Sequence, residues 1–173
     1  MSFVSYFITD PKFSLTQTFN AIKIHKPTFV CYRNKEYFDE KEIREFALFA
    51  KQYSKTFINL HSLKNTELLE LFDGVHIPSA ELDKIKNYKH KTVIASTHSF
   101  KEVKKAINAD FITFSPVFNS KGRKGLGVDV LKEVCNIHPN VLALGGIISE
   151  KEVEKIKNSC AKGFASIRYF YTT

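Results

Sequence analysis

The stretch TVIASTHSFKEVKKAINADFITFSPVF, residues 92–118, holds two apolar runs of strand length with a helical segment between them. The runs TVIAST (92–97) and FITFSPVF (111–118) are rich in β-branched and aromatic residues, as strands are. Between them, Ser99 and Glu102 have the spacing of a capping box, which predicts the start of a helix. Because both runs are largely apolar on both faces, the stretch is typical of a strand–helix–strand unit in a parallel sheet covered by helices.

The same alternation of strand and helix signals recurs along the whole chain. Two further capping spacings, Asp39 with Glu42 and Ser149 with Glu152, each precede a segment of helical character. Eight units in 173 residues predict a compact (β/α)8 TIM barrel that forms a single domain over residues 1–173, with a doubly wound open sheet as the alternative. The six other predicted strands are residues 3–9, 28–33, 56–60, 74–77, 141–147 and 163–168.

The eighth unit of this barrel is short. After the run at 163–168 only YFYTT remains, so we expect the eighth outer helix to be missing. The apolar side chains of the last strand would then form an exposed patch, which monomeric proteins rarely tolerate. We therefore predict a homodimer with two-fold symmetry, in which each subunit covers the gap of the other.

Composition narrows the class of protein and the kind of ligand. The chain is 43% hydrophobic and 25% charged, and it has no apolar run long enough to span a bilayer. Its first residues, MSFVSYFITD, lack the features of a secretory signal, so we expect a cytoplasmic protein with no membrane contact. The net charge of +8 is dispersed and no nucleic-acid recognition module is visible, which favours a small phosphorylated ligand over nucleic acid.

The three cysteines, Cys31, Cys135 and Cys160, are far apart in the sequence and have no metal-binding spacing to the histidines. We therefore expect neither a disulfide nor a structural zinc site.

The carboxyl ends of the strands carry the candidate site, as they do in TIM barrels. The segment FSPVFNSKGRKGLG, residues 114–127, combines glycine with basic side chains, a composition that suits an anion-binding loop. Gly145 and Gly146 follow the apolar residues 141–144 of the seventh predicted strand segment, and loops after strands seven and eight often bind phosphate. The predicted phosphate-binding residues are Gly145, Gly146, Ile167, Arg168, Ser120 and Lys124.

The histidines divide by their position in the predicted units. His98 ends the fifth strand and is the candidate for proton transfer. His76 could either line the pocket or pack below it. We expect His25, His90 and His138, beside helix ends, to be surface residues.

The motifs at these strand ends resemble, in order, those of the thiamine phosphate synthase and TenI superfamily. The motifs are GVH (74–76), STH (96–98), PVF (116–118) and GGI (145–147). The resemblance implies binding of a thiazole phosphate. Thiamine phosphate synthases use magnesium to join a pyrimidine methyl pyrophosphate to the thiazole phosphate carboxylate, whereas TenI proteins are thiazole tautomerases that move a proton on the same ring.

Departures from the synthase pattern distinguish these two activities. In place of Gln-x-Arg-x-Lys the chain has CYRNK, which keeps Arg33 and Lys35 but places Cys31 at the glutamine position. In place of Asn-Asp it has Asn59 followed by Leu60, and an apolar side chain cannot bind magnesium.

Two further positions favour the tautomerase pattern. The HIPS stretch, which ends at Ser79, is similar to a TenI motif. In the synthase Thr-x-Thr-Lys pattern, Ser120 stands at the first threonine, Gly122 at the second and Arg123 at the lysine. After the fourth strand, where a synthase has an acidic residue, Glu81 is the only carboxylate in register to bind a metal.

The resemblance therefore implies a TenI-like thiazole tautomerase that needs no cofactor, with His98 as its catalytic residue. The alternatives are a thiamine phosphate synthase, using magnesium and Glu81, and a non-catalytic protein that binds thiazole phosphate or thiamine phosphate. The expected substrate-binding residues are Arg33, Lys35, Asn59, Ser79, Ser96 and Arg123.

Overall fold

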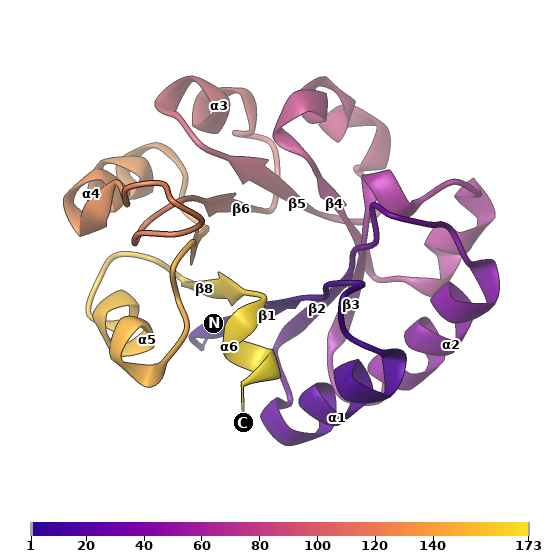
Figure 1. Ribbon diagram of the computed structural model, residues 1–173. Helices are drawn as coiled ribbons and strands as arrows, with labels where there is room; N and C mark the ends of the chain where they lie inside the picture. The colour runs from indigo at the N-terminus through magenta and orange to yellow at the C-terminus, as the bar shows by residue number, and fades with distance from the viewer. Residues whose placement is uncertain (1, 173) are drawn as a thin grey trace.

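The computed structural model describes residues 2–172, which form a closed barrel of eight parallel strands (Figure 1). Each strand pairs with the next along the chain, and the last pairs with the first, so that Val4 lies opposite Gly163. The predicted TIM barrel is therefore confirmed. The strands are β1 Val4–Ile8, β2 Phe29–Tyr32, β3 Lys55–Asn59, β4 Gly74–Ile77, β5 Thr92–Thr97, β6 Phe111–Phe114, β7 Val141–Leu144 and β8 Gly163–Ser166.

Three strands end two to four residues earlier than the sequence predicts. β6 stops at Phe114 because Pro116 has no N–H to continue a ladder, and the Ser115–Pro116 peptide bond is cis. β7 stops before Gly145 and Gly146, whose positive φ angles turn the chain. β8 ends at Ser166, where a short helix begins to form.

The helices outside the barrel are short, as a chain of this length requires. In the third and fourth units, 3-10 helices take the place of α-helices. The α-helices are α1 Leu15–His25, α2 Glu40–Ala50, α3 Phe100–Lys105, α4 Gly127–Ile137, α5 Glu150–Lys157 and α6 Arg168–Tyr171, and the 3-10 helices are η1 Leu60–Ser62, η2 Thr66–Leu71 and η3 Ser79–Tyr88.

The predicted helix starts are confirmed, because Asp39, Ser99 and Ser149 each cap a helix with their side chains. Only the Ser149 cap is a complete, reciprocal capping box with its third-position glutamate. The carboxylate of Glu102 instead accepts a hydrogen bond from the backbone N–H of His98, and that of Glu42 accepts from two tyrosine hydroxyls.

The apolar core has two parts, one inside the barrel and one between the strands and the helices. Inside the barrel, Tyr6, Phe29 and Phe57 pack edge-on or tilted against one another with ring centroids 5.1–6.0 Å apart. Outside it, Ile43 and Phe46 lie on the buried stripe of α2 that the sequence predicts. The barrel interior is thus packed with side chains, as in other TIM barrels.

The end of the chain differs from the prediction that the eighth outer helix is missing. Arg168–Tyr171 form one helical turn, α6, which folds back beside β1 and α1 (Figure 1). Phe170 is 1% exposed and stacks on Phe7 with ring centroids 4.8 Å apart. The Tyr171 hydroxyl lies 2.9 Å from the Thr18 hydroxyl. Because the tail covers the apolar strip, that strip no longer argues for a homodimer.

The cysteines and one histidine also differ from expectation. The sulfurs of Cys135, in α4, and Cys160, after α5, are joined by a disulfide with an S–S distance of 2.13 Å. Neighbouring units of the barrel bring these residues together although they are 25 positions apart in the sequence. His138 is buried rather than at the surface, because its ring accepts from the N–H of Asn140 and contacts the carbonyl oxygen of Ala109.

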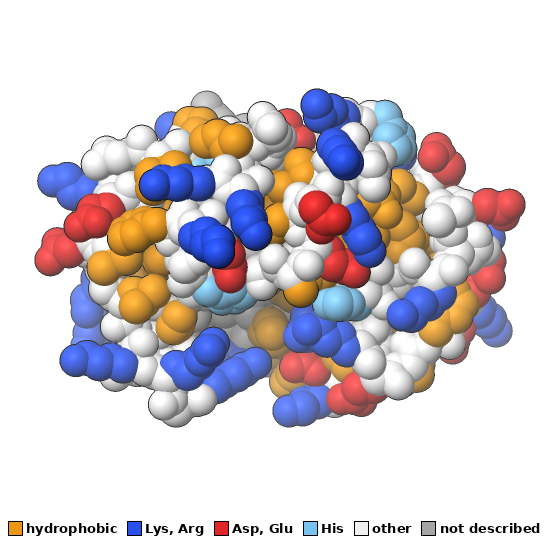
Figure 2. All heavy atoms as spheres, turned by 90° about the horizontal axis from the view of Figure 1, so that it is seen from above, with side chains coloured by type: hydrophobic (Ala, Val, Ile, Leu, Met, Phe, Trp, Pro, Cys, Tyr) orange, Lys and Arg blue, Asp and Glu red, His pale blue; other side chains and the backbone are white. Residues whose placement is uncertain are grey.

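Basic and acidic side chains lie side by side on one face of the molecule, where Figure 2 shows Lys and Arg side chains spread among Asp and Glu. Among residues 2–172, no helix has the length and apolar character needed to span a membrane.

Candidate active site

A cavity of about 540 Å³ opens at the carboxyl ends of the strands. All eight strands, or the residues directly after them, contribute to its wall. Of the residues predicted for the site, those that line the cavity are His98, Gly145, Gly146, Ile167, Arg168, Ser120, Arg33, Lys35, Asn59, Ser79, Ser96 and Arg123. Lys124 and Glu81 do not line it.

The loop after β6 is held against the loop after β7 at one side of this cavity. The N–H groups of Val117 and Phe118 donate to the carbonyl oxygens of Leu144 and Gly145 at 2.9 and 3.0 Å. At Gly146 the φ angle is +72°, and a Cβ atom there would lie 2.5 Å from the carbonyl oxygen of Asn119. Glycine is therefore required where the two loops meet, as well as to expose backbone N–H groups.

The tip of the loop after β6 is a tight turn that carries positive charge to the cavity. Ser120 and Arg123 exchange two backbone hydrogen bonds, at 3.0 and 2.9 Å. Lys121 and Gly122 between them have φ angles of +50° and +73°, the conformation of a type I′ turn. This turn places Ser120, Lys121 and Arg123 in the cavity wall, while Lys124 points elsewhere.

Positive charge is concentrated at the cavity mouth. Burial, followed by the nearby charges of Arg33 and Lys121, lowers the pKa of Lys35. Burial and the charge of Lys35 likewise lower the pKa of His61. Positive groups that lie close together destabilise one another's charged forms, and a bound anion offsets this repulsion. The mouth of the cavity therefore suits a phosphorylated ligand.

His98 lies in the cavity wall and is oriented by a carboxylate. Glu102, one turn into α3, accepts a hydrogen bond from the backbone N–H of His98 at 2.8 Å, and its Oε2 lies 3.1 Å from Nδ1 of the same ring. A carboxylate at Nδ1 holds the proton there and leaves Nε2 free to accept one. This arrangement can transfer a proton to or from a ligand in the cavity.

His76 both lines the cavity and packs below it. Its side chain is 3% exposed, with Nε2 2.6 Å from the Ser96 hydroxyl and Nδ1 2.7 Å from the Tyr6 hydroxyl. Burial, with smaller effects from the charges of Arg33 and Lys35, lowers the pKa of His76 to about 3. The ring is therefore neutral near neutral pH and is a weak base.

Sequence reasoning assigned no role to several residues that the fold brings to the cavity. Asp10 follows β1 and supplies a carboxylate at a mouth that is otherwise basic. His61 follows β3, and this position near the end of a predicted strand is the sequence signal that could have identified it as a cavity residue. The others include Lys12 and Phe13, which lie on a loop whose course a sequence pattern does not define.

The donor set around the cavity does not fit magnesium. Leu60 stands after Asn59 and packs against the core. The Glu81 carboxylate lies outside the cavity wall and is paired with the Lys84 ammonium at 3.0 Å. Within the described part of the chain, no three Asp, Glu, His or Cys side chains gather as metal ligands. Mg²⁺ takes oxygen ligands, mainly carboxylates and water, so Leu60 and Glu81 do not supply the metal-binding pair expected of a synthase. Asp10 is the one carboxylate among the described residues that line the cavity.

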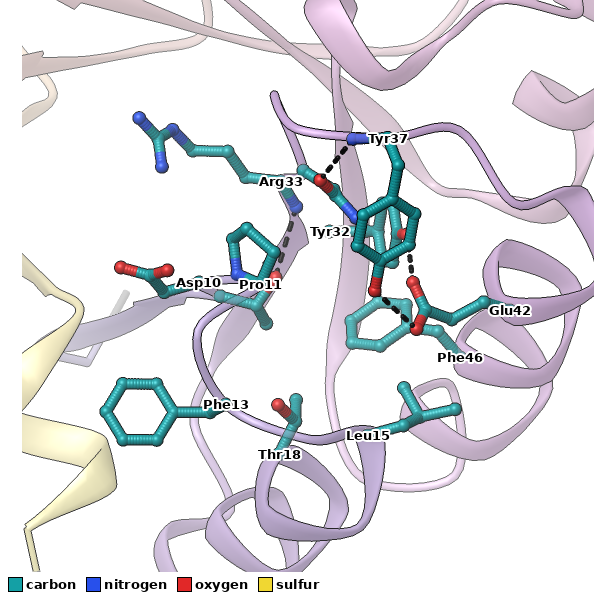
Figure 3. Close-up of a pocket in the computed structure, with 12 residues that line it drawn as sticks. Asp10, Pro11, Phe13, Leu15, Thr18, Tyr32, Arg33, Tyr37, Glu42 and Phe46 are labelled. Carbon is teal, nitrogen blue, oxygen red and sulfur yellow. Dashed lines mark hydrogen bonds between the residues drawn. The ribbon is translucent and has the colours of Figure 1, made fainter.

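A second, smaller pocket lies beside the mouth, between β2 and α2. In Figure 3 the hydroxyls of Tyr32 and Tyr37 point toward the Glu42 carboxylate, and Arg33 extends away from it. The pocket has a volume of about 20 Å³, enough for one water molecule. It is therefore too small for a substrate, and the large cavity is the candidate ligand site.

Comparison with known proteins identifies the family. Residues 5–170 match the TMP-TENI family, which is described as thiamine monophosphate synthase. This chain belongs to that family. The match covers nearly the whole barrel and therefore includes every strand end that lines the cavity. Membership places the protein among the enzymes of thiamine biosynthesis.

Solved structures similar to this family member share its fold. A thiamine phosphate pyrophosphorylase from Pyrococcus furiosus is 19% identical, with a TM-score of 0.71 over 95% of this chain and 85% of that one. One from Bacteroides thetaiotaomicron is also 19% identical, with a TM-score of 0.70 over 98% and 84%. A tryptophan synthase complex from P. furiosus reaches 0.70 at 12% identity, over 98% and 88%. No curated protein sequence matches the chain. Such distant likenesses concern the barrel alone.

Proposed function

We propose that this member of the family is a TenI-like thiazole tautomerase, which converts a thiazole phosphate carboxylate to its aromatic tautomer. The observation that carries the proposal is His98 in the cavity wall, paired with Glu102 behind it, beside a rim that would bind phosphate and without the metal-binding pair of a synthase. Proton transfer on a bound ring needs a positioned acid–base group and no metal.

The substrate is held at its phosphate end by the loops after β6, β7 and β8. Backbone N–H groups of Gly146 and Ile167, the Ser120 hydroxyl and the Arg168 guanidinium would contact the phosphate oxygens, since all four residues line one cavity. With the phosphate held there, the ring would lie toward His98, which directly follows β5.

His98 then moves the proton. Nε2 accepts a proton from the ring carbon that bears the carboxylate, and the electron pair released enters the ring system. The imidazolium that results is stabilised by Glu102 at Nδ1. Return of a proton to a different atom of the conjugated system completes an isomerisation in which atoms and charge balance.

Thiamine phosphate synthase is the second candidate. It is favoured by Arg33, Lys35 and Asn59, which line the cavity on the side where a pyrimidine pyrophosphate would bind. The apolar Leu60 and the Lys84-paired Glu81 count against it, because the reaction uses magnesium. A protein that binds thiazole phosphate or thiamine phosphate without turnover is the third.

One incubation series separates the three candidates. The protein is given thiazole phosphate carboxylate alone, then with pyrimidine methyl pyrophosphate, with and without magnesium, and products are followed by proton NMR. A tautomerase aromatises the thiazole in the first incubation. Magnesium-dependent formation of thiamine phosphate would overturn the proposal in favour of the synthase. Thermal stabilisation by the thiazole without any product would identify a binder.

A further inference from the structure

A chain of hydrogen bonds runs from the buried barrel interior to the cavity wall. It joins Tyr6 on β1, His76 on β4 and Ser96 on β5, with distances of 2.7 Å from the Tyr6 hydroxyl to Nδ1 and 2.6 Å from Nε2 to the Ser96 Oγ. Tyr6 is 0% exposed, whereas Ser96 is partly exposed in the cavity. A ligand in the cavity can therefore reach Ser96 and the edge of His76 but not Tyr6.

The direction of these hydrogen bonds follows from the surroundings of Tyr6. The Cys31 thiol also interacts with the Tyr6 hydroxyl, and it is a weak acceptor that remains protonated because burial raises its pKa to about 12. The Cys31 thiol lies 3.6 Å from the carbonyl oxygen of Tyr32 and donates to it. The Tyr6 hydroxyl therefore donates its proton to Nδ1 of His76, the stronger acceptor.

The tautomer of the His76 ring determines the direction of its hydrogen bond to Ser96. A neutral imidazole carries one proton, and when Nδ1 accepts a hydrogen bond that proton lies on Nε2. Nε2 then donates to the Ser96 Oγ across 2.6 Å. With its oxygen already accepting from Nε2, the Ser96 hydroxyl directs its own proton toward the cavity.

We propose that Tyr6 and His76 are positioning residues that fix the Ser96 hydroxyl as a hydrogen-bond donor to the ring end of the substrate. This inference rests on the proposed function for the identity of the substrate. Ser96 precedes His98 by two residues on β5, away from the phosphate-binding loops after β7 and β8. Its partner is therefore a carboxylate oxygen or ring heteroatom next to the carbon that loses its proton.

The hydrogen-bond direction can be measured without any substrate. We would record nitrogen NMR shifts of ¹⁵N-histidine-labelled full chain between pH 5 and 8, and assign His76 by the signal that His76→Gln removes. We expect a neutral ring protonated at Nε2. In Tyr6→Phe the chemical shift of His76 Nδ1 should change, because the hydroxyl that donates to it is removed. Tyr32→Phe is the control: it removes a hydroxyl on the other side of the strand layer and should leave this chemical shift unchanged. A ring protonated at Nδ1 would overturn the proposal.

The donor role of Ser96 is tested by turnover of thiazole phosphate carboxylate. Loss of one hydrogen bond to the reacting end of the substrate should lower kcat about tenfold in Ser96→Ala, with a smaller change in KM. Ser96→Thr, which keeps the hydroxyl, should restore most of this loss, and Tyr6→Phe should lower kcat less than Ser96→Ala does. Wild-type kcat/KM in Ser96→Ala would reject the donor role.

The two proposals fail in distinguishable ways. If the wild-type protein aromatises no thiazole, the proposed function fails. The NMR measurement of the His76 tautomer then decides alone whether the Tyr6–His76–Ser96 hydrogen bonds have the proposed direction. If the thiazole is turned over but His76 is protonated at Nδ1, the proposed direction of the hydrogen bonds is wrong and the tautomerase proposal is retained. Thermal unfolding of Tyr6→Phe verifies that the variant is folded.

Discussion

His98 and Glu102 lie four residues apart across the start of α3, so that one carboxylate holds both the backbone and the ring of the histidine. General acid–base catalysis contributes roughly 10²- to 10⁴-fold to a rate. We expect His98→Asn to lower kcat for the thiazole substrate by about that factor while the fold is retained. Product formation by NMR measures it, and His90→Asn, at an exposed histidine outside the cavity, is the matched control. A rate near that of the wild type would remove His98 from the mechanism.

Two buried histidines should make the protein sensitive to acid. Burial lowers the pKa of His76 to about 3, and burial also lowers that of His138. Below about pH 6.5, where an unfolded histidine binds a proton, the unfolded chain takes up protons that the folded chain does not. The free energy of unfolding should therefore fall as the pH drops from about 6.5 toward 3, by at most about 1.4 kcal/mol per pH unit for each histidine.

Urea unfolding between pH 7 and pH 5 measures this dependence. The variant His138→Gln should show a shallower decrease than the wild type, because one of the two protons no longer contributes. An unfolding midpoint that is constant over this range would contradict the prediction.

At the level of single residues, the sequence predicts those that belong to a local pattern. His98, the glycine pair and Ser120 follow predicted strands, and the strand ends of a barrel meet at one mouth. The contact between Tyr6 and His76 joins residues 70 positions apart, and their side-chain directions depend on the packing of the whole barrel interior. Glu102 was predicted as a helix cap, but its contact with the His98 ring needs the side-chain geometry.

At the level of elements, the ends of the helices offer a test of backbone conformation. Lys26, which ends α1, has φ of 44° and ψ of 58°, a left-handed conformation that costs a residue with a Cβ atom. Lys26→Gly should raise the free energy of unfolding by about 0.5–1 kcal/mol. Lys51 ends α2 with φ of −62°, so Lys51→Gly should instead lower it by a similar amount.

Chemical denaturation of the two variants beside the wild type gives the comparison. Both changes remove one surface lysine, so the loss of charge is matched and only the backbone conformation differs. Equal shifts of the two variants in the same direction would show that charge, not conformation, controls the result.

The element types that the sequence could not predict lie in the third and fourth units. Segments such as η3 have helical spacing of apolar residues, yet Glu81 has φ of −126° and interrupts the helix. The connection from residue 78 to residue 91 is no shorter than the one from 98 to 110, which contains α3, so the length of chain does not explain the difference. Helix propensity is a weak guide here because tertiary packing overrides it.

For the molecule as a whole, closure of the barrel depends on its last residues. Phe170 stacks on Phe7 and Phe164 with ring centroids 4.8 and 5.8 Å apart, and it covers the strip that the sequence predicted to be exposed. Replacing a buried phenylalanine by alanine removes its packing and leaves a cavity, which costs about 3–5 kcal/mol. We expect Phe170→Ala to lose that much stability in urea unfolding and to bind a hydrophobic dye, which the wild-type protein should not.

The same contacts define what a homodimer of this protein would require. Because Phe170 and Tyr171 occupy the strip beside β1 and β8, the predicted dimer has to pair through a different face. Sedimentation of the wild-type protein at micromolar concentration tests the dimer itself, and a single species of monomer mass contradicts it. Sedimentation of Phe170→Ala tests the part played by the tail: uncovering the strip should add a larger, concentration-dependent species, because an apolar patch of this kind promotes association. An unchanged mass in that variant would mean that neighbouring aromatic side chains reseal the barrel without Phe170.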